Sequence, residues 1–206
     1  LRAFHAAGGR RFVSVGSCAE YDWVEPGDRL SEQAPRRPAT LYGIAKDALR
    51  RMIEGYARQV GLSWAWGVLF FSFGPHERPE RLVPSVIRDL LAAREARTTA
   101  GTQARDFRDV RDQGMALAAL LDGAVEGPVN IGSGEATTVA EVVRRLGDLT
   151  GRPDLLRIGA LPMRPDEPPR LVADVCRLRE EVGFRPRFAL DRGLSDAVAW
   201  WRENAG

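Results

Sequence analysis

The sequence predicts an α/β protein in which helices cover a sheet of parallel strands. Three observations lead to this prediction. Apolar residues recur at helical spacing over 40–60, residues 63–71 form a nearly continuous apolar run, and residues 1–75 alternate helix, strand, helix and strand. A continuous apolar run is typical of a strand buried on both faces, and the alternation is typical of a parallel sheet, because each crossover between parallel strands is usually a helix.

The elements of this first part have recognisable boundaries. Thr40 can cap the long helix through its hydroxyl, and Gly61 can end that helix because glycine readily takes a positive φ. In chain order, the sequence predicts a helix end over 1–7, a strand over 11–15, a polar stretch over 22–39, the long helix over 40–60 and the strand over 63–71.

Beyond residue 75 the alternation becomes less regular. Thr138 and Glu141 form a capping-box pair at the start of one helix. The sequence predicts helices over 82–96, 110–121, 139–149, 174–182 and 191–204, and short strands over 97–100, 129–132, 156–158 and 171–172. This part is therefore interpreted as a smaller α+β lobe with long loops, which commonly line a pocket.

The charges are nearly balanced. Lys and Arg number 30, Asp and Glu number 28, and the formal net charge is +2. This balance supplies no general attraction to nucleic acid or to a membrane surface, so we expect neither partner. Lys46 is the single lysine, which leaves 30 − 1 = 29 arginines, an excess typical of a GC-rich genome. A lysine in such a chain is either there by chance or occupies a position where the planar arginine fork cannot replace a compact charge.

The cysteine content favours a reducing compartment, and we expect a cytoplasmic location. Cys18 and Cys176 are too few for a disulfide framework, and we expect no metal site. No apolar run approaches the roughly 20 residues of a membrane-spanning helix, and no secretory signal is visible. The chain begins at Leu1 within a helix-like segment, so we expect an upstream part.

The chemistry of Lys46 depends on its neighbours. Tyr42 lies four positions earlier on the predicted helix and shares its face. An ammonium group beside a phenol stabilises the phenolate, and a tyrosine tuned in this way can pass a proton to or from a substrate oxygen. Ser17 follows a predicted strand at the sheet edge where ligands bind, so its hydroxyl can hold the same oxygen. From these residues alone, a second interpretation stays open, in which Lys46 is an ordinary exposed lysine beside a half-buried tyrosine.

Further motifs accompany these three residues in a fixed order along the chain. They are Tyr21 four residues after the serine, Phe-Phe-Ser-Phe-Gly-Pro at 70–75, Arg105-Asp106-Phe107 with Asp112, Asn-Ile-Gly at 130–132, Arg-Pro-Asp-Glu at 164–167 and Gly-Phe-Arg-Pro at 183–186. Together with Ser17 and Tyr42-Gly43-Ile44-Ala45-Lys46, this set resembles the extended short-chain dehydrogenases/reductases, the nucleotide-sugar epimerases and dehydratases. The resemblance covers essentially the whole chain.

The resemblance implies a partial Rossmann-like fold. Residues 1–75 would be the second half of an NAD(P)-binding domain, and residues 76–206 would be mainly a substrate-binding lobe, with some segments returning to the first domain. The implied cofactor is NAD or NADP, and the implied partner is a nucleotide sugar. Members are commonly homodimers through the helix that carries the Tyr-Lys pair.

The resemblance also implies a role for each site residue. Tyr42 would be the general acid/base, Lys46 would support it and hydrogen-bond the nicotinamide ribose, and Ser17 would orient the sugar oxygen. The cofactor would carry the hydride. The other implied contacts are Phe70 along the nicotinamide, Phe71 near the sugar, and Arg105 and Arg164 on the substrate diphosphate, a task suited to guanidinium forks. For both phenylalanines, plain strand core is the alternative.

The largest departure from the family is a missing motif. The family's Gly-x-x-Gly-x-x-Gly turn, which binds the cofactor pyrophosphate, does not occur in this sequence. The chain is therefore expected to be the C-terminal part of a longer enzyme, or a truncated reading frame, and to be inactive alone. The residue that selects NAD or NADP would lie upstream. Strands near Val13 and Ala65 would have unpaired apolar edges, which predicts poor solubility or self-association.

Smaller departures bear on the reaction. The family's dehydratases carry Asp-Glu directly after the catalytic hydroxyl residue, whereas this chain has Cys18 and Ala19, so an epimerase or 4-keto reductase is favoured. Val68 and Phe71 stand where the family commonly has Arg and Asn, which makes the pocket less polar. Two alternatives stay open: a non-catalytic dinucleotide-binding sensor or scaffold of the same fold, and an arginine-rich nucleic-acid binder, which the near-neutral charge opposes.

Overall fold

The structure is a computed structural model, and it describes residues 1–24 and 27–204. Contacts between Cα atoms divide the chain into two compact units, each made of three segments. Unit 1 comprises residues 1–70, 113–134 and 171–185, and unit 2 comprises residues 71–112, 135–170 and 186–206. The roles expected for residues 1–75 and 76–206 in cofactor and substrate binding remain predictions.

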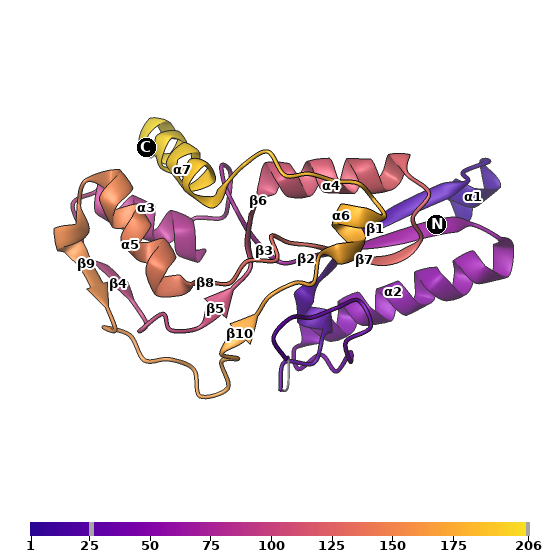
Figure 1. The fold of residues 1–206 in the computed structure, drawn as a ribbon, viewed down its shortest axis with the longest axis horizontal. Coiled ribbons are helices and arrows are strands. Elements are labelled where there is room, and N and C mark those ends of the chain that lie inside the picture. The colour runs from indigo at the N-terminus through magenta and orange to yellow at the C-terminus, as the bar shows by residue number, and fades with distance from the viewer. Residues whose placement is uncertain (25–26, 205–206) are drawn as a thin grey trace. The chain divides into compact units, whose positions relative to one another are not determined.

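Unit 1 contains the parallel sheet that the sequence predicts (Figure 1). Its described strands are β1 (Arg11–Ser17), β2 (Ser63–Leu69) and β7 (Gly127–Ile131), in the order β1-β2-β7. In the register of this sheet Ser17 lies beside Leu69, and Leu69 lies beside Ile131. The carboxyl ends of the three strands therefore meet at one edge, with Ser17 on it.

β2 is the central strand, which corrects one expectation. We expected unpaired edges on the strands near both Val13 and Ala65, but β2 pairs with β1 on one side and with β7 on the other. Within the described residues, β1 and β7 are the two outer strands of this sheet, and each has one edge without a neighbouring strand. Residues 65–68 of β2 are buried, as a strand between two neighbours and under helices requires.

Helices cover both faces of this sheet, with α2 (Leu41–Val60) on one side and α4 (Val110–Asp122) on the other (Figure 1). The predicted boundaries of α2 are confirmed, because the Thr40 hydroxyl accepts a hydrogen bond from the Gly43 N–H at 3.1 Å, and Gly61 ends the helix at a φ of 67°. The shorter helices of unit 1 are α1 (Arg2–Ala6), the 3₁₀ turn Cys18–Glu20 and α6 (Cys176–Glu180).

The predicted strand over 63–71 does not continue as one element. The Phe70 N–H donates to the carbonyl of Ile131, the last residue of β7, whereas the Phe71 N–H donates to the carbonyl of Asp106. Consecutive residues thus bond to different parts of the chain, and Phe71 begins a separate strand, β3 (Phe71–Phe73). The apolar run hides this break because both sides of it are hydrophobic.

Unit 2 consists of three helices around an apolar core and several very short strands. Phe73, Ile87, Val142, Leu146 and Leu194 are among the fully buried residues of that core. The helices are α3 (Leu82–Leu91), α5 (Val139–Thr150) and α7 (Leu190–Asn204), with a 3₁₀ turn at Pro153–Leu155. The strands pair as β3 with β6 (Phe107–Asp109), β4 (Ala96–Thr98) with β9 (Leu156–Ile158), and β5 (Ala104–Arg105) with β8 (Thr137–Thr138) and β10 (Arg170–Leu171).

Several predicted boundaries in the second half differ from the structure. The helix predicted over 82–96 ends at Leu91, and the strand expected over 97–100 is Ala96–Thr98. The helix predicted over 174–182 is reduced to Cys176–Glu180, and the strand over 171–172 is Arg170–Leu171. The helix over 82–96 was extended too far because Ala92 and Ala93 are good helix formers, yet Ala93 has a φ of 54°, which is incompatible with a helix.

Candidate active site

Ser17 is held at the end of β1 by the turn that follows it. Its hydroxyl oxygen accepts a hydrogen bond from the Ala19 N–H at 3.2 Å, while its own N–H donates to a carboxylate oxygen of Glu20 at 2.8 Å. These reciprocal bonds form a capping box. A hydroxyl has one proton and two lone pairs, so the Ala19 contact leaves the Ser17 proton able to donate to a bound oxygen.

Lys46 brings its ammonium group to the same strand end. The Nζ atom donates to the carbonyl oxygen of Val15, two residues before Ser17, at 2.9 Å. It also lies 5.9 Å from the centre of the Tyr42 ring. The Tyr42 side chain is 56% exposed, so its phenol is open to a ligand. Unit 1 thus brings Ser17, Tyr42 and Lys46 to the contact between α2 and the end of β1.

Gly43 explains how α2 comes so close to this turn. A Cβ atom on Gly43 would collide with the carbonyl oxygen of Ala19 and with Pro38. The helix can therefore approach the residues after Ser17 only because glycine stands beside Tyr42. The same close approach lets the Lys46 side chain reach the carbonyl of Val15.

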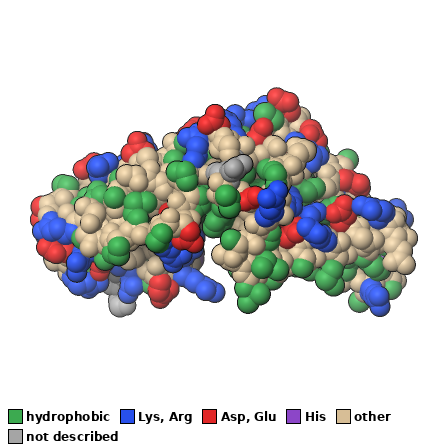
Figure 2. Space-filling model, turned by 90° about the horizontal axis from the view of Figure 1, so that it is seen from below, with side chains coloured by type: hydrophobic (Ala, Val, Ile, Leu, Met, Phe, Trp, Pro, Cys, Tyr) green, Lys and Arg blue, Asp and Glu red, His purple; other side chains and the backbone are tan. Residues whose placement is uncertain are grey.

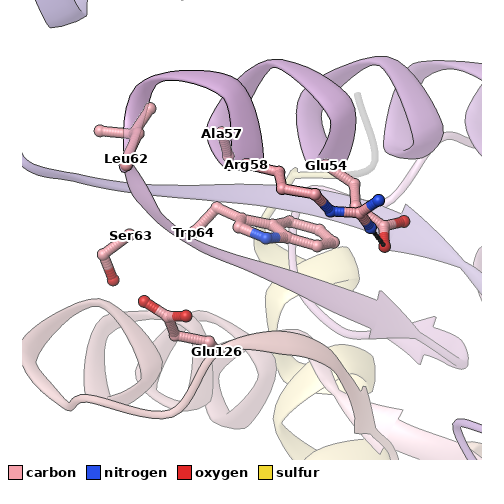
Figure 3. Close-up of a pocket in the computed structure, with 8 residues that line it drawn as sticks. Glu54, Ala57, Arg58, Leu62, Ser63, Trp64 and Glu126 are labelled. Atoms are coloured by element: carbon pink, nitrogen blue, oxygen red, sulfur yellow. Dashed lines mark hydrogen bonds and ion pairs between the residues drawn. The ribbon is translucent and has the colours of Figure 1, made fainter.

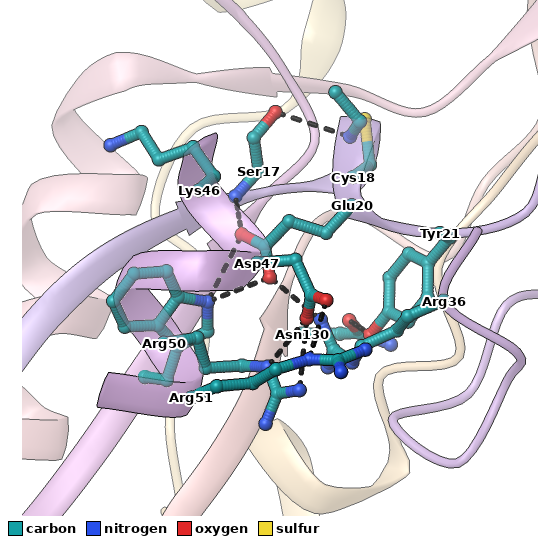
Figure 4. Close-up of polar contacts among 12 residues, drawn as sticks. Ser17, Cys18, Glu20, Tyr21, Arg36, Lys46, Asp47, Arg50, Arg51 and Asn130 are labelled. Carbon is teal, nitrogen blue, oxygen red and sulfur yellow. Dashed lines mark hydrogen bonds and ion pairs between the residues drawn. The ribbon is translucent and has the colours of Figure 1, made fainter. Parts of the chain in front are cut away.

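Sequence reasoning missed the buried carboxylate that supports Ser17 (Figure 4). Glu20 has no exposed surface, and both of its oxygens lie 3.1 Å from the indole nitrogen of Trp66. The Arg36 guanidinium donates to Glu20 at 2.7 Å. Burial raises the pKa of Glu20, and the hydrogen bond from Ser17, the charge of Arg36 and the Trp66 contact oppose that rise. A signal was available, because Ser17-Cys-Ala-Glu20 is a capping-box pattern.

A second polar group packs beside this carboxylate. The Tyr21 hydroxyl donates to the Asn130 side chain at 2.7 Å, and the Asn130 amide donates to the carbonyls of Leu30 and Asp174 at 2.8 and 3.1 Å. Burial raises the pKa of Tyr21, so this tyrosine stays neutral. Two of the motifs noted in the sequence, at Tyr21 and at Asn130, therefore meet in one buried network (Figure 4).

Phe70 belongs to the core of unit 1. Its side chain is 3% exposed, and its ring centre lies 6.4 Å from that of Tyr21. The structure thus places Phe70 in the core, as the alternative interpretation expected. A contact between Phe70 and the nicotinamide stays a prediction.

The other predicted ligand residues lie together in unit 2. A pocket of about 380 Å³ is lined by Phe71 from β3, Arg105 from β5 and Arg164 from the loop before β10. The Arg105 side chain is 4% exposed; it donates to the carbonyls of Ala104 and Pro168 at 2.8 and 2.9 Å and forms an ion pair with Glu167. Its guanidinium carbon lies 5.4 Å from the centre of the Phe71 ring.

A further pocket, of about 370 Å³, lies in unit 1 at the start of β2, at the opposite end of that strand from Leu69 (Figure 3). Trp64 and Glu54 line it together with Glu126, and Glu54 is already paired with Arg50 and Arg58. None of the predicted site residues lines this pocket.

The surface and composition show few other candidate sites. On the face shown in Figure 2, basic and acidic side chains are intermixed. Over the described ranges, no three His, Cys, Asp or Glu side chains are grouped so that they could hold a metal ion. Within the same ranges, no helix has the length and apolar character that a membrane span requires.

Comparisons with known proteins agree with this architecture. Residues 1–132 match the model of the NAD dependent epimerase/dehydratase family. The chain is 26% identical to dTDP-glucose 4,6-dehydratase of Xanthomonas campestris over 94% of its own length and 58% of that protein. It is 33% identical to UDP-glucose 4-epimerase of Streptomyces lividans over 97% of its own length and 65% of that protein. The chain thus spans about three fifths of the length of these relatives.

A solved structure has the same fold. The crystal structure of UDP-glucose 4-epimerase with UDP-glucose from Thermotoga maritima superimposes with a TM-score of 0.92 and 23% identity. The match covers 100% of this chain and 67% of that epimerase. The expected Rossmann-like α/β fold is therefore confirmed.

Proposed function

The chain belongs to the NAD dependent epimerase/dehydratase family, and from this premise we propose that the complete protein is an NAD(P)-dependent nucleotide-sugar epimerase or 4-keto reductase. The observation that supports this most strongly is the position of Lys46. Its ammonium group reaches the end of β1 beside Tyr42, at the strand that terminates in Ser17. An exposed phenol, an ammonium group and a serine hydroxyl at one sheet edge are the groups that proton transfer at a sugar oxygen needs.

The residues of this chain fit a bound nicotinamide ribose. An ammonium group has three donors, and the Val15 carbonyl takes one of those of Lys46, which leaves two for ribose hydroxyls. The cofactor, when bound, supplies the hydride chemistry. The described residues hold no pyrophosphate-binding glycine turn, so we expect the 206-residue chain alone to show no turnover.

In the proposed mechanism Tyr42 takes the proton of a sugar hydroxyl when that carbon is oxidised and returns it when the carbonyl is reduced. Lys46 stabilises the phenolate form between these two steps through its positive charge. Ser17 donates its hydroxyl proton to the same sugar oxygen and keeps it near Tyr42. The Glu20 carboxylate holds the Ser17 N–H and so fixes the backbone from which that hydroxyl projects.

The pocket of unit 2 is proposed to hold the substrate. Arg105 and Arg164 would bind the diphosphate, and Phe71 would contact the sugar with its ring. The sugar, the base and the choice between NAD and NADP are not assigned by these residues.

Water elimination is not proposed, although several of the similar proteins are dehydratases. The turn after Ser17 carries Cys18, whose side chain is buried, and Ala19, so neither residue supplies an acid or base. The next carboxylate, Glu20, is bound by Arg36 and Trp66 and has no exposed surface. The alternative function is a non-catalytic dinucleotide-binding sensor or scaffold, and the retained Tyr42 and Lys46 argue against it.

We also propose a homodimer through α2. One face of this helix leaves apolar side chains exposed, with Leu41 83% and Met52 71% accessible and Ile44 and Leu49 on the same side. Met52→Glu should shift the sedimentation coefficient from that of a dimer to that of a monomer, whereas the exposed-charge variant Arg51→Gln should not. A wild-type monomer at high concentration would contradict the proposal.

The function is tested with the complete protein in two assays, one with a 4-keto nucleotide sugar and NADPH and one with a nucleotide sugar such as UDP-glucose and NAD. Net consumption of NADPH identifies a reductase, and exchange of sugar isomers without net consumption identifies an epimerase. Tyr42→Phe should lower kcat by about a hundredfold or more, because general acid/base catalysis contributes roughly 10²–10⁴, while Tyr56→Phe, on the same helix, should retain activity. Activity of Tyr42→Phe within a few-fold of wild type would refute the mechanism.

A further inference from the structure

The pocket of unit 2 carries as many negative as positive side chains. Arg81, Arg105 and Arg164 line it, and so do Glu77, Glu80 and Glu167. Counted as ordinary ionised groups, three positive and three negative charges cancel. A pocket with these charges has no net attraction for a diphosphate. For the arginines to bind the anion, one of the carboxylates has to become protonated or move out of the pocket.

Two of the three arginines are already engaged by these carboxylates. Arg105 is paired with Glu167 and is also fixed by two backbone carbonyls. Arg81 is paired with Glu77 over 3.5 Å, a long contact, and the Arg81 side chain is 61% exposed. Of these two engaged arginines, Arg81 is thus the one that a ligand can take over with less rearrangement.

Glu77 is poorly satisfied compared with the other pocket carboxylates. Its side chain is 16% exposed, and its Oε2 atom is buried with no hydrogen-bond donor among the described residues. Burial raises the pKa of Glu77 to about 7, against the charge and the hydrogen bond of Arg81. This carboxyl group is therefore poised between its charged and neutral forms near neutral pH.

The backbone keeps Glu77 in this position. The preceding residue, His76, has a φ of 64°, which non-glycine residues rarely adopt, and its ring centre lies 4.7 Å from that of Trp200 on α7. The ring contact thus anchors the segment that carries Glu77 and Arg81. The charged groups around Glu77 are Arg81 and Glu80 on its own segment, Arg105 on β5, and Arg164 and Glu167 on the loop before β10, with His76 beside it.

We propose that Glu77 sets the charge specificity of this pocket: it takes up a proton from solvent when the diphosphate held by Arg105 and Arg164 also engages Arg81, which leaves the pocket with the net positive charge that a dianion requires. The proposal rests on the proposed function, in which the diphosphate binds here. A second negative charge near Glu77 disfavours its carboxylate form further, and the loss of Arg81 as a partner acts in the same direction. Binding of the diphosphate then weakens as the pH rises above neutrality, because the proton concentration falls and protonation of Glu77 costs more free energy.

The test is calorimetric titration of the 206-residue chain with UDP-glucose at pH of about 7.5 in two buffers of different ionisation enthalpy. UDP-glucose is chosen because its doubly esterified diphosphate does not change charge between about pH 6 and pH 9. We expect uptake of about half a proton per ligand bound, and a Kd that rises about three- to tenfold from pH 7 to pH 8.5. Glu77→Gln should abolish both effects, and Glu80→Gln, a change of the exposed neighbour, should keep the proton uptake whatever its effect on affinity.

Each outcome separates this inference from the proposed function. Binding of UDP-glucose without proton uptake, or uptake that persists in Glu77→Gln, overturns the role of Glu77 and leaves the substrate class intact. If UDP-glucose does not bind but inorganic pyrophosphate binds with a proton uptake that Glu77→Gln removes, the role of Glu77 stands and the nucleotide-sugar assignment fails. If neither ligand binds, both are refuted.

Discussion

The two units contain the same local motif in different surroundings. In unit 1 the capping box joins Ser17 to Glu20, and in unit 2 it joins Thr138 to Glu141, with the same reciprocal hydrogen bonds. The pKa of Glu20 is raised by burial, whereas the hydrogen bonds from Thr138 lower the pKa of the exposed Glu141. Both carboxylates accept the backbone N–H of the capping residue, and Glu141 also accepts a hydrogen bond from the Thr138 hydroxyl. Burial is the largest cause of the Glu20 shift, so solvent exposure decides its direction.

Glu77 extends the comparison to a third carboxyl group. Glu20 and Glu77 are both destabilised in their charged form by burial, but Glu20 has the Arg36, Trp66 and Ser17 donors around it, whereas Glu77 has one long contact to Arg81. A buried carboxylate with a full set of donors is part of the framework. A buried carboxylate that lacks donors and lines a pocket changes its protonation when a charged ligand enters that pocket.

The largest expected effect is the loss of the Glu20 carboxylate. Glu20→Ala should lower the free energy of unfolding by about 3–5 kcal/mol, because it leaves the buried Arg36 and the Trp66 indole without their partner. The matched change at the exposed box, Glu141→Ala, should cost less than about 1 kcal/mol. Urea denaturation of the two variants measures the difference, and equal losses would contradict the role of burial.

The next effect concerns Glu77 and pH. The folded-state pKa is raised to about 7 from 4.5, so between these values the folded state binds more protons than the unfolded state, and stability falls as the pH rises. Glu77→Gln removes this loss. The variant should therefore gain on the order of 3 kcal/mol over wild type as the pH increases from about 4.5 to 7, with no further gain above that range. Denaturation experiments over this pH range measure the difference in unfolding free energy between the variant and wild type. A difference that does not change with pH would contradict this prediction.

A smaller effect is expected from a methyl group at Gly16. A Cβ atom there would collide with the Trp66 indole nitrogen and with the Glu20 carboxylate. Gly16→Ala should cost about 1–3 kcal/mol through overpacking. Gly55→Ala is the control, because nothing lies within 4 Å of a Cβ at this exposed position of α2, and it should stabilise by about 0.5–1 kcal/mol. Thermal unfolding should show shifts of opposite sign.

The smallest effect tests the capping bond itself. Thr138→Ala removes the hydroxyl that accepts from the Glu141 N–H at 3.2 Å, and it should cost about 1 kcal/mol. Thr138→Ser keeps the hydroxyl and should restore nearly all of that stability. Equal losses of unfolding free energy in Thr138→Ala and Glu20→Ala would contradict this view. The hydrogen bonds within each capping box, and not the burial of the carboxylate, would then determine how much the box stabilises the protein.

Sequence patterns predicted the parts of the molecule that depend on local rules. The helical spacing of Tyr42 and Lys46, the Thr40 cap and the parallel strands around β2 follow from periodicity and turn chemistry, and the structure confirms them. The break after Phe70 was missed because it arises from bonds to Ile131 and Asp106, which are distant in sequence.

Other features of the site escaped prediction for physical reasons. β6 (Phe107–Asp109) is short and mostly polar, so it has neither an apolar run nor a clear alternation. The charge balance of the unit 2 pocket depends on Glu77 and Glu167, whose contacts with Arg81 and Arg105 are set by the fold. The roles of the site residues remain predictions that the experiments above address.

The division of the chain into two units has a consequence for gene engineering. The chain passes between the units after Phe70, Asp112, Gly134, Arg170 and Arg185. Neither unit is encoded by one uninterrupted stretch of the gene, so no single pair of start and stop codons can express either of them alone. A circular permutation or a split reporter would have to open the chain within a surface loop of one unit and keep all of these passages intact.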